Sequence, residues 1–172
     1  ICINTKKIEK AYEKYEELDG TLAFDGSTYY LLSIMGLLRR EYDKAMEHID
    51  TAIAMDKKIP FFHLLKGVIS YWKAIPKDVC LPDDLYPVMF ANGLFKLEAD
   101  GLGLIRSAVE NYRKAYSLAE NVDNKMQMEV ILSTWINTLS VDYEFQTAIA
   151  EPLQLLKKSD SYNVTALLYM IH

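Results

Sequence analysis

The sequence contains only two cysteines, Cys2 and Cys80, and they form no metal-binding or redox motif. The sequence does not decide whether they form one long-range disulfide, but two isolated cysteines favour a reduced compartment. We therefore expect a cytoplasmic, intracellular protein. No run of about 18 apolar residues occurs, which argues against a membrane-spanning helix. Seven glycines and five prolines among 172 residues are few, so we do not expect a disordered chain.

Basic residues are not concentrated anywhere in the chain. The net charge is −5, and acidic and basic residues are interspersed. The longest basic runs are the pairs Lys6-Lys7, Arg39-Arg40, Lys57-Lys58 and Lys157-Lys158. Because nucleic-acid binding requires a concentrated basic face for phosphate contacts, we expect no nucleic-acid partner.

Residues with catalytic or metal-binding chemistry do not form a recognisable site. The three histidines, His48, His63 and His172, are scattered, and we expect His48 on a solvated side of its helix. Gly101-Leu102-Gly103 lacks the rest of a phosphate-binding loop, and Asp83-Asp84 suits a helix N-terminus. We therefore expect no catalytic residue, no metal and no cofactor. An enzyme with its site around residues 76–103 remains a minor alternative.

The sequence does contain a strong helical pattern, and 51% of its residues are hydrophobic. The clearest example covers residues 41–56, with apolar residues at positions 42, 45, 46, 49, 52, 53 and 55. Steps of three and four place these residues on one side of a helix. On that side, the small residues Ala45 and Ala52 would let a neighbouring helix approach closely.

This alanine-centred spacing recurs along the chain, around Ala11, Ala108 and Ala148. Ala11 and Ala45 are 34 residues apart, whereas Ala45 and Ala108 are 63 apart and Ala108 and Ala148 are 40 apart. The long interval contains Pro76, Pro82 and Pro87, and we interpret 76–103 as an inserted loop and helix. A recurring spacing of this kind predicts a helical repeat.

The periodicity predicts nine helices and no strand, so the expected class is all-α. The helices are expected at about 4–18, 28–40, 42–56, 60–74, 83–98, 103–120, 125–140, 143–158 and 162–171. The helix at 28–40 is apolar on most of its surface and is expected to be buried between neighbours. Pro152 is expected to kink or split the helix at 143–158. The apolar side of 162–171 lacks a partner helix, which favours a homo-oligomer formed through it.

The segment from Glu41 to Ala52 resembles the second helix of a tetratricopeptide repeat, a family with a period of about 34 residues and an A-x3-F feature. Ala45-x3-Ile49-x2-Ala52 matches that feature, and Glu41-Tyr42-Asp43-Lys44-Ala45 resembles the entry to the helix. In the preceding helix, Leu32-Ser33 stands where the family often has Leu-Gly, and Tyr29 stands at its aromatic position.

Later units match this family less closely. Gly67 takes the small-residue position of the next unit, but Lys66 replaces the apolar residue before it. Trp135-Ile136 and Pro152 depart further from the pattern. The resemblance covers most of the chain outside residues 76–101, and its recurrence carries more weight than any single match.

The resemblance implies a right-handed α-solenoid of antiparallel helix hairpins, forming one domain over residues 1–172. It also implies a protein- or peptide-binding scaffold whose concave groove is lined by the first helix of each hairpin. The candidate contacts at the apolar and aromatic end of this groove are Tyr30, Ile34, Leu37, Phe61, Leu64, Val68 and Tyr71. At the polar end they are Ser133, Asn137 and Ser140. Tyr30 and Ile34 stand where some relatives carry residues that clamp a peptide's terminal carboxylate, so such a clamp is not expected.

Two further questions stay open from the sequence. The expected helix at 83–98 either leaves the apolar groove open to a partner or folds back and covers it. The chain is also either a scaffold on its own or a sensor or regulatory segment of a larger multidomain signalling or transcription-regulating protein. The missing initial Met favours the second arrangement. The full-length reading frame would decide between the two.

Overall fold

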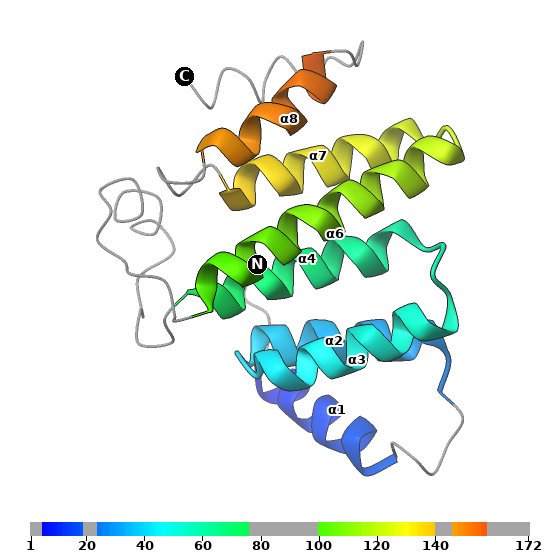
Figure 1. Ribbon diagram of the computed structural model, residues 1–172. Helices are drawn as coiled ribbons and strands as arrows, with labels where there is room; N and C mark the ends of the chain where they lie inside the picture. The colour runs from blue at the N-terminus through cyan, green and yellow to red at the C-terminus, as the bar shows by residue number, and fades with distance from the viewer. Residues whose placement is uncertain (1–4, 19–23, 76–99, 140–145, 158–172) are drawn as a thin grey trace.

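The computed structural model describes residues 5–18, 24–75, 100–139 and 146–157, and these ranges contain seven helices and no strand (Figure 1). The helices are α1 (Thr5–Leu18), α2 (Gly26–Leu38), α3 (Tyr42–Met55), α4 (Pro60–Ala74), α6 (Gly101–Asn121), α7 (Lys125–Leu139) and α8 (Gln146–Lys157). The all-α class is therefore confirmed for this part of the chain. The helices expected at 83–98 and 162–171 lie outside the described residues, as does Ser140.

Helix starts follow local chemistry that is visible in the sequence. The Asp25 side chain caps α2: its Oδ1 accepts hydrogen bonds from the backbone amide of Thr28 (2.8 Å) and from the Thr28 hydroxyl (2.7 Å). These hydrogen bonds favour the ionised carboxylate and hold the pKa of Asp25 below its ordinary value. Pro60 begins α4, where its missing amide hydrogen costs no helical hydrogen bond.

Two helix ends use the same tight turn without a glycine. Arg40 follows α2 with a φ of 60°, and the amide of Glu41 donates to the carbonyl of Gly36 (2.9 Å). The end of α6 repeats this geometry at Asp123, where φ is 49° and the next amide donates to the carbonyl of Ala119 (3.0 Å). Such a turn satisfies the last free carbonyls and redirects the chain within a few residues. Each of these helices can therefore pack directly against the helix that follows it.

Helices pack mainly against their neighbours in sequence. In Figure 1, α2 lies against α3, α3 against α4, α6 against α7, and α7 against α8. The most extensive contact joins α4 to α6, although residues 76–99 separate them in sequence. The predicted insertion therefore interrupts a helix pair without separating its two helices.

Close helix approach occurs where the alanine spacing predicts it in α3. Ala45, Ile49 and Ala52 are completely buried. A Cβ atom added at Gly36 of α2 would lie only 3.1 Å from the Cβ of Ala45. The hydroxyl of Ser33, also on α2, donates a 2.7 Å hydrogen bond to the carbonyl of Ala45. The small residues thus bring the backbones of α2 and α3 into near contact.

The same arrangement recurs between α4 and α6. Ala108, Tyr112 and Ala115 of α6 are completely buried, like their counterparts in α3. A Cβ atom added at Gly67 of α4 would lie 3.1 Å from the carbonyl oxygen of Ala108 and 2.5 Å from Cε1 of Tyr112. The predicted alanine spacing is therefore confirmed as a packing face in two helices that are 63 residues apart in sequence.

The other two predicted copies of the spacing differ from these. In α1, Ala11 is half-buried and Tyr15 is 40% exposed, although the ring of Tyr15 meets that of Phe24 edge-on at a centroid distance of 6.0 Å. In α8, Pro152 is buried and the helix continues through it to Lys157. The split expected at Pro152 is therefore wrong, whereas the kink given as its alternative stays a prediction, because a proline removes one helical hydrogen bond.

The helix α4 divides the interior into two apolar clusters. Phe62, Leu65 and Ile69 pack with α2 and α3, whereas Leu64 and Tyr71 pack with α6, α7 and α8. Trp72 lies half-buried against both clusters. Because α4 contributes to both sides, it joins the first helix pair to the rest of the described structure.

Candidate partner-binding surface

All seven residues predicted to line the apolar groove lie on α2 and α4. On α2, Tyr30, Ile34 and Leu37 are half-buried and pack against the cluster formed with α3 and α4. The ring of Tyr30 stacks on that of Phe62, with 5.5 Å between the ring centroids. Partial burial of the phenol disfavours its anion and raises the pKa of Tyr30. These three side chains each keep some surface available for contact.

The four residues on α4 divide into two kinds. Leu64 is 8% exposed and Tyr71 is 3% exposed, and both belong to the cluster with α6 and α7. Phe61 and Val68 are half-buried at the edge of that cluster. Leu64 and Tyr71 therefore contribute mainly to packing, and Phe61 and Val68 are the α4 residues that a partner can reach.

The candidate contacts predicted from the sequence do not include two exposed leucines on α2. Leu31 is 52% exposed and Leu38 is 55% exposed. The sequence predicts that this helix is buried between its neighbours, and most of its residues are buried or half-buried, but these two leucines are not. A helix that is apolar all round gives no sign of which side faces outward, because that is decided by the helices around it. The seven-residue interval between the leucines was the available signal, since it places both on one line of the helix.

The predicted polar end lies on α7. Asn137 is exposed, and its Nδ2 lies 3.5 Å from the hydroxyl oxygen of the half-buried Ser133. One turn earlier, the Thr134 hydroxyl donates to the carbonyl of Val130 within the helix (2.8 Å). This part of α7 therefore presents side-chain amide and hydroxyl groups, in contrast with the apolar surface of α2.

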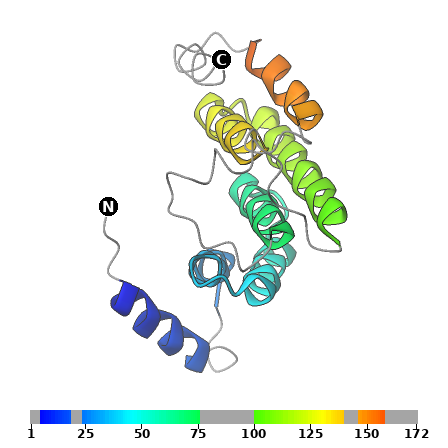
Figure 2. The same cartoon turned by 90° about the vertical axis from the view of Figure 1, so that its left-hand side faces the viewer.

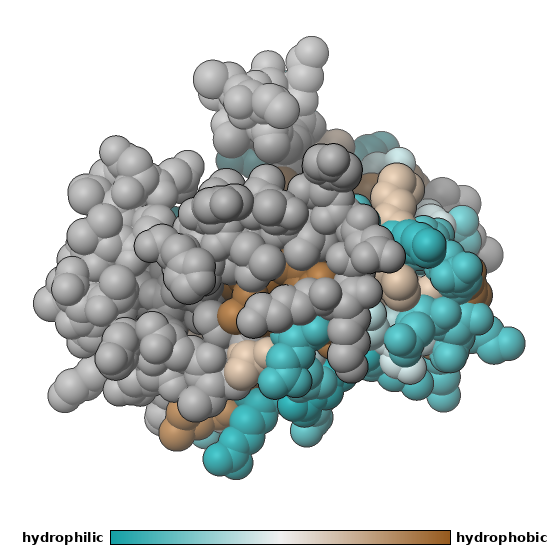
Figure 3. Space-filling view, turned by 90° about the horizontal axis from the view of Figure 1, so that it is seen from above, coloured by the Kyte–Doolittle hydropathy of each residue, from teal (hydrophilic) through white to brown (hydrophobic). Residues whose placement is uncertain are grey.

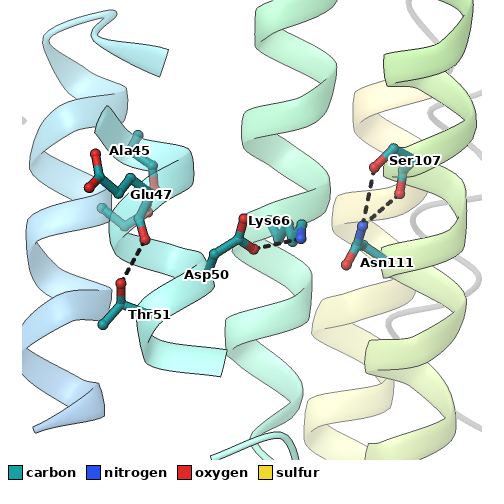
Figure 4. A network of polar contacts seen from close by, with 8 residues as sticks. Ala45, Glu47, Asp50, Thr51, Lys66, Ser107 and Asn111 are labelled. Carbon is teal, nitrogen blue, oxygen red and sulfur yellow. Dashed lines mark hydrogen bonds and ion pairs between the residues drawn. The ribbon is translucent and has the colours of Figure 1, made fainter. Parts of the chain in front are cut away.

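Charged side chains near α3 and α4 pair with each other across the two helices. Lys66 on α4 contacts Asp50 on α3 at 2.5 Å (Figure 4), and Lys73 contacts Asp43 at 2.6 Å. In α6, Arg113 contacts Glu151 of α8 at 2.6 Å, and this carboxylate raises the pKa of Arg113. Surface pairs of this kind add little stability individually. They join neighbouring helices, and they do not gather one sign of charge at a ligand site.

The two described histidines are packed into the structure. His48 is only 8% exposed and lies between the rings of Tyr12 and Tyr29, at centroid distances of 6.5 Å and 6.1 Å. The expectation of a solvated His48 is wrong, because α1 covers this side of α3. The Nε2 atom of His63 lies 3.0 Å from the carbonyl oxygen of Lys57. Within the described ranges, no three His, Cys, Asp or Glu residues are grouped to hold a metal ion.

The exposed surface at the α8 end of the molecule is mixed. Viewed from above, the described atoms are mostly hydrophilic, with small hydrophobic patches beside the atoms drawn in grey (Figure 3). Among the helices that the structure describes, none combines the length and apolar character needed to cross a bilayer.

Comparison with known proteins yields no relative. No protein-family model matches the chain, no curated protein sequence matches it, and no solved structure matches its fold.

Proposed function

We propose that this chain is a non-enzymatic scaffold of the tetratricopeptide-like kind, which holds a segment of a partner protein against the surface of α2 and α4. In this proposal the helix pairs stack in one direction as a right-handed α-solenoid, with residues 1–172 as one domain. Stacking of this type leaves one continuous face along the first helices of the pairs, and such faces generally bind other polypeptides.

The observation that carries the repeat architecture is the duplicated close crossing of helices. Ser33 of α2 meets the carbonyl of Ala45, and Gly67 of α4 approaches the carbonyl of Ala108 in the same way. A single helix pair could acquire one such crossing by chance. Two crossings built from corresponding residues of successive pairs support a repeated structural unit.

The observation that supports partner binding is the apolar surface of α2. This helix carries no charged residue from Gly26 to Leu38, and Leu31 and Leu38 are more than half exposed. The half-buried Tyr30, Ile34 and Leu37 lie on the same helix. Contiguous exposed apolar residues on a helix face are typical of surfaces that bind a hydrophobic or amphipathic segment.

Affinity capture tests the proposal. The tagged chain is used to capture proteins that mass spectrometry identifies, and the capture is repeated with the double variant Tyr30→Ala, Phe61→Ala. We expect this variant to lose the partners retained by the original chain, because it removes aromatic contact area from both α2 and α4. Circular dichroism should show unchanged helicity.

A matched control uses exposed apolar residues that lie outside α2 and α4. Val122 and Met126 are 67% and 72% exposed near the turn between α6 and α7. The variant Val122→Ser, Met126→Ser should keep the same partners. If the Tyr30, Phe61 variant also keeps every partner, the surface of α2 and α4 is not the binding site.

A further inference from the structure

The outward side of α2 carries an apolar row that is separate from the contacts holding this helix in place. Leu31 is 52% exposed, Leu38 is 55% exposed, and Met35 between them is half-buried. Steps of four and three residues place the three side chains on one side of the helix. Other sides of α2 meet α3 through Ser33 and α4 through Tyr30. Figure 2 views α2 nearly end-on, with α3 beside it and α1 below both.

The charges of α2 lie only at its two ends, and the ends differ in sign. No acidic or basic residue occurs from Gly26 to Leu38. Asp25 precedes the helix, Arg40 follows it, and both are exposed. Two parallel copies of α2 would bring like charges together, whereas two antiparallel copies bring Asp25 of each beside Arg40 of the other. Charge complementarity therefore favours an antiparallel pairing of α2 with itself.

We propose that this chain forms a two-fold symmetric dimer in which α2 packs antiparallel against α2 of a second copy. Leu31 of each copy lies opposite Leu38 of the other, and Met35 lies near the two-fold axis. Burial of the exposed leucines drives the association, and the interface uses one surface twice, as symmetric dimers do. The dimer goes beyond the proposed function, because it occupies the outward side of α2 and leaves Tyr30 and Phe61 to a partner.

The size of the contact predicts a weak dimer. An interface made mainly by one helix from each copy is smaller than the roughly 1,600 Å² that stable interfaces bury. We therefore expect monomers and dimers to exchange, with a dissociation constant of about 10–100 μM. Sedimentation equilibrium of the full chain should show an average mass that rises with concentration from the monomer value towards twice that value.

Replacement of the exposed leucines tests which surface associates. The double variant Leu31→Ser, Leu38→Ser should stay monomeric at the highest concentration, with an unchanged circular dichroism spectrum. The matched control Leu102→Ser, Val122→Ser changes residues that are 58% and 67% exposed, and it should associate like the original chain. An original chain that stays monomeric, or association that persists without the two leucines, would overturn the proposal.

Disulfide cross-linking tests the antiparallel orientation. The background carries Cys2→Ser and Cys80→Ser, and one chain then receives Leu31→Cys while another receives Leu38→Cys. The two positions are about 10 Å apart along one helix, two turns, so antiparallel copies separate identical positions by a similar distance. Because a disulfide spans at most about 7 Å between Cα atoms, the mixed chains should cross-link at least about fivefold faster than either chain alone. Faster cross-linking within the Leu31→Cys chain alone would indicate parallel helices and contradict the proposal.

A charge reversal tests the contribution of the helix ends. Arg40→Asp should weaken self-association at least about threefold, because like charges then meet at both ends of the helix pair. Arg106→Asp, at an exposed position of α6, should leave it unchanged. Equal association of the two variants would remove the charge argument and, with it, the antiparallel pairing.

One further variant separates the dimer from the proposed function. Tyr30→Ala, Phe61→Ala should self-associate like the original chain, because these rings lie on the side of α2 towards α4 and on α4 itself. Loss of partner capture in this variant with an intact dimer would support two separate surfaces. Loss of the dimer in this variant would show that a different side of α2 makes the contact and would overturn the proposal.

Discussion

The glycine at position 67 lies directly against the aromatic ring of Tyr112. A Cβ atom at Gly67 would lie 2.5 Å from Cε1 and 2.7 Å from Cδ1 of this ring, well inside contact distance. The ring cannot easily move away, because Tyr112 is completely buried and its ring packs beside that of Trp135 at a centroid distance of 5.9 Å. This contact decides how closely α4 and α6 approach each other.

We expect Gly67→Ala to lower the free energy of unfolding by about 2–3 kcal/mol, because the added methyl group must displace a buried ring. Urea denaturation followed by circular dichroism measures the change. The control is Gly103→Ala in the first turns of α6, where an added Cβ meets no atom within 4 Å. That substitution should raise stability by about 0.5–1 kcal/mol, since alanine favours the helix. Equal effects at the two positions would contradict the packing account.

We expect Arg40→Gly to raise the free energy of unfolding by about 0.5–1 kcal/mol. Arg40 has a φ of 60°, a left-handed conformation that glycine adopts without strain. Arg40→Val should instead lower stability, because a β-branched residue fits this conformation poorly. Thermal unfolding of the three chains measures the order, and a Gly variant less stable than the original would contradict the prediction.

The hydrogen bonds to Asp25 predict a specific pH dependence of stability. The pKa of Asp25 is lower in the folded chain than its ordinary value of 3.8, so its cap stabilises the fold above that value. This contribution is lost as the pH falls through the lowered folded pKa. The variant Asp25→Ser keeps a capping oxygen that does not titrate. The stability difference between the two chains should therefore be constant above about pH 5 and shift against Asp25 below the ordinary value. A difference that is independent of pH would contradict the prediction.

We expect Ser33→Ala to lower the free energy of unfolding by about 1 kcal/mol. The Ser33 hydroxyl is buried and donates a 2.7 Å hydrogen bond to the carbonyl of Ala45, which joins α2 to α3. Ser117→Ala on the exposed side of α6 is the matched control and should leave stability unchanged or slightly higher. The same denaturation experiment measures both, and a neutral Ser33→Ala would show that this hydrogen bond adds no net stability.

Local chemistry made the helices predictable. The starts of α2 and α4 follow from Asp25 and Pro60, and α1 and α4 have the expected boundaries within one residue. The buried faces around Ala45 and Ala108 were also predictable, because steps of three and four residues place them on one side of a helix. Two starts differ from the expected ones: α2 begins at Gly26 and α6 at Gly101, each two residues earlier than expected.

Tertiary packing decided which predicted faces are covered. Leu31 and Leu38 are exposed because neighbouring helices occupy other sides of α2, and a helix that is apolar all round has no inherent inner side. Among the candidate groove residues, Leu64 and Tyr71 became part of the core because α6 and α7 lie against their side of α4.

The amino-acid sequence by itself determined the helical class, the main helix boundaries and the small-residue faces at Ala45 and Ala108, because these depend on interactions within a few turns of chain. Only the tertiary structure decided that Tyr12 is completely buried where Tyr15 stays 40% exposed, and that His48 is enclosed between two tyrosines. Exposure of a side chain depends on which other helix reaches it, and residues far apart in the sequence supply that helix.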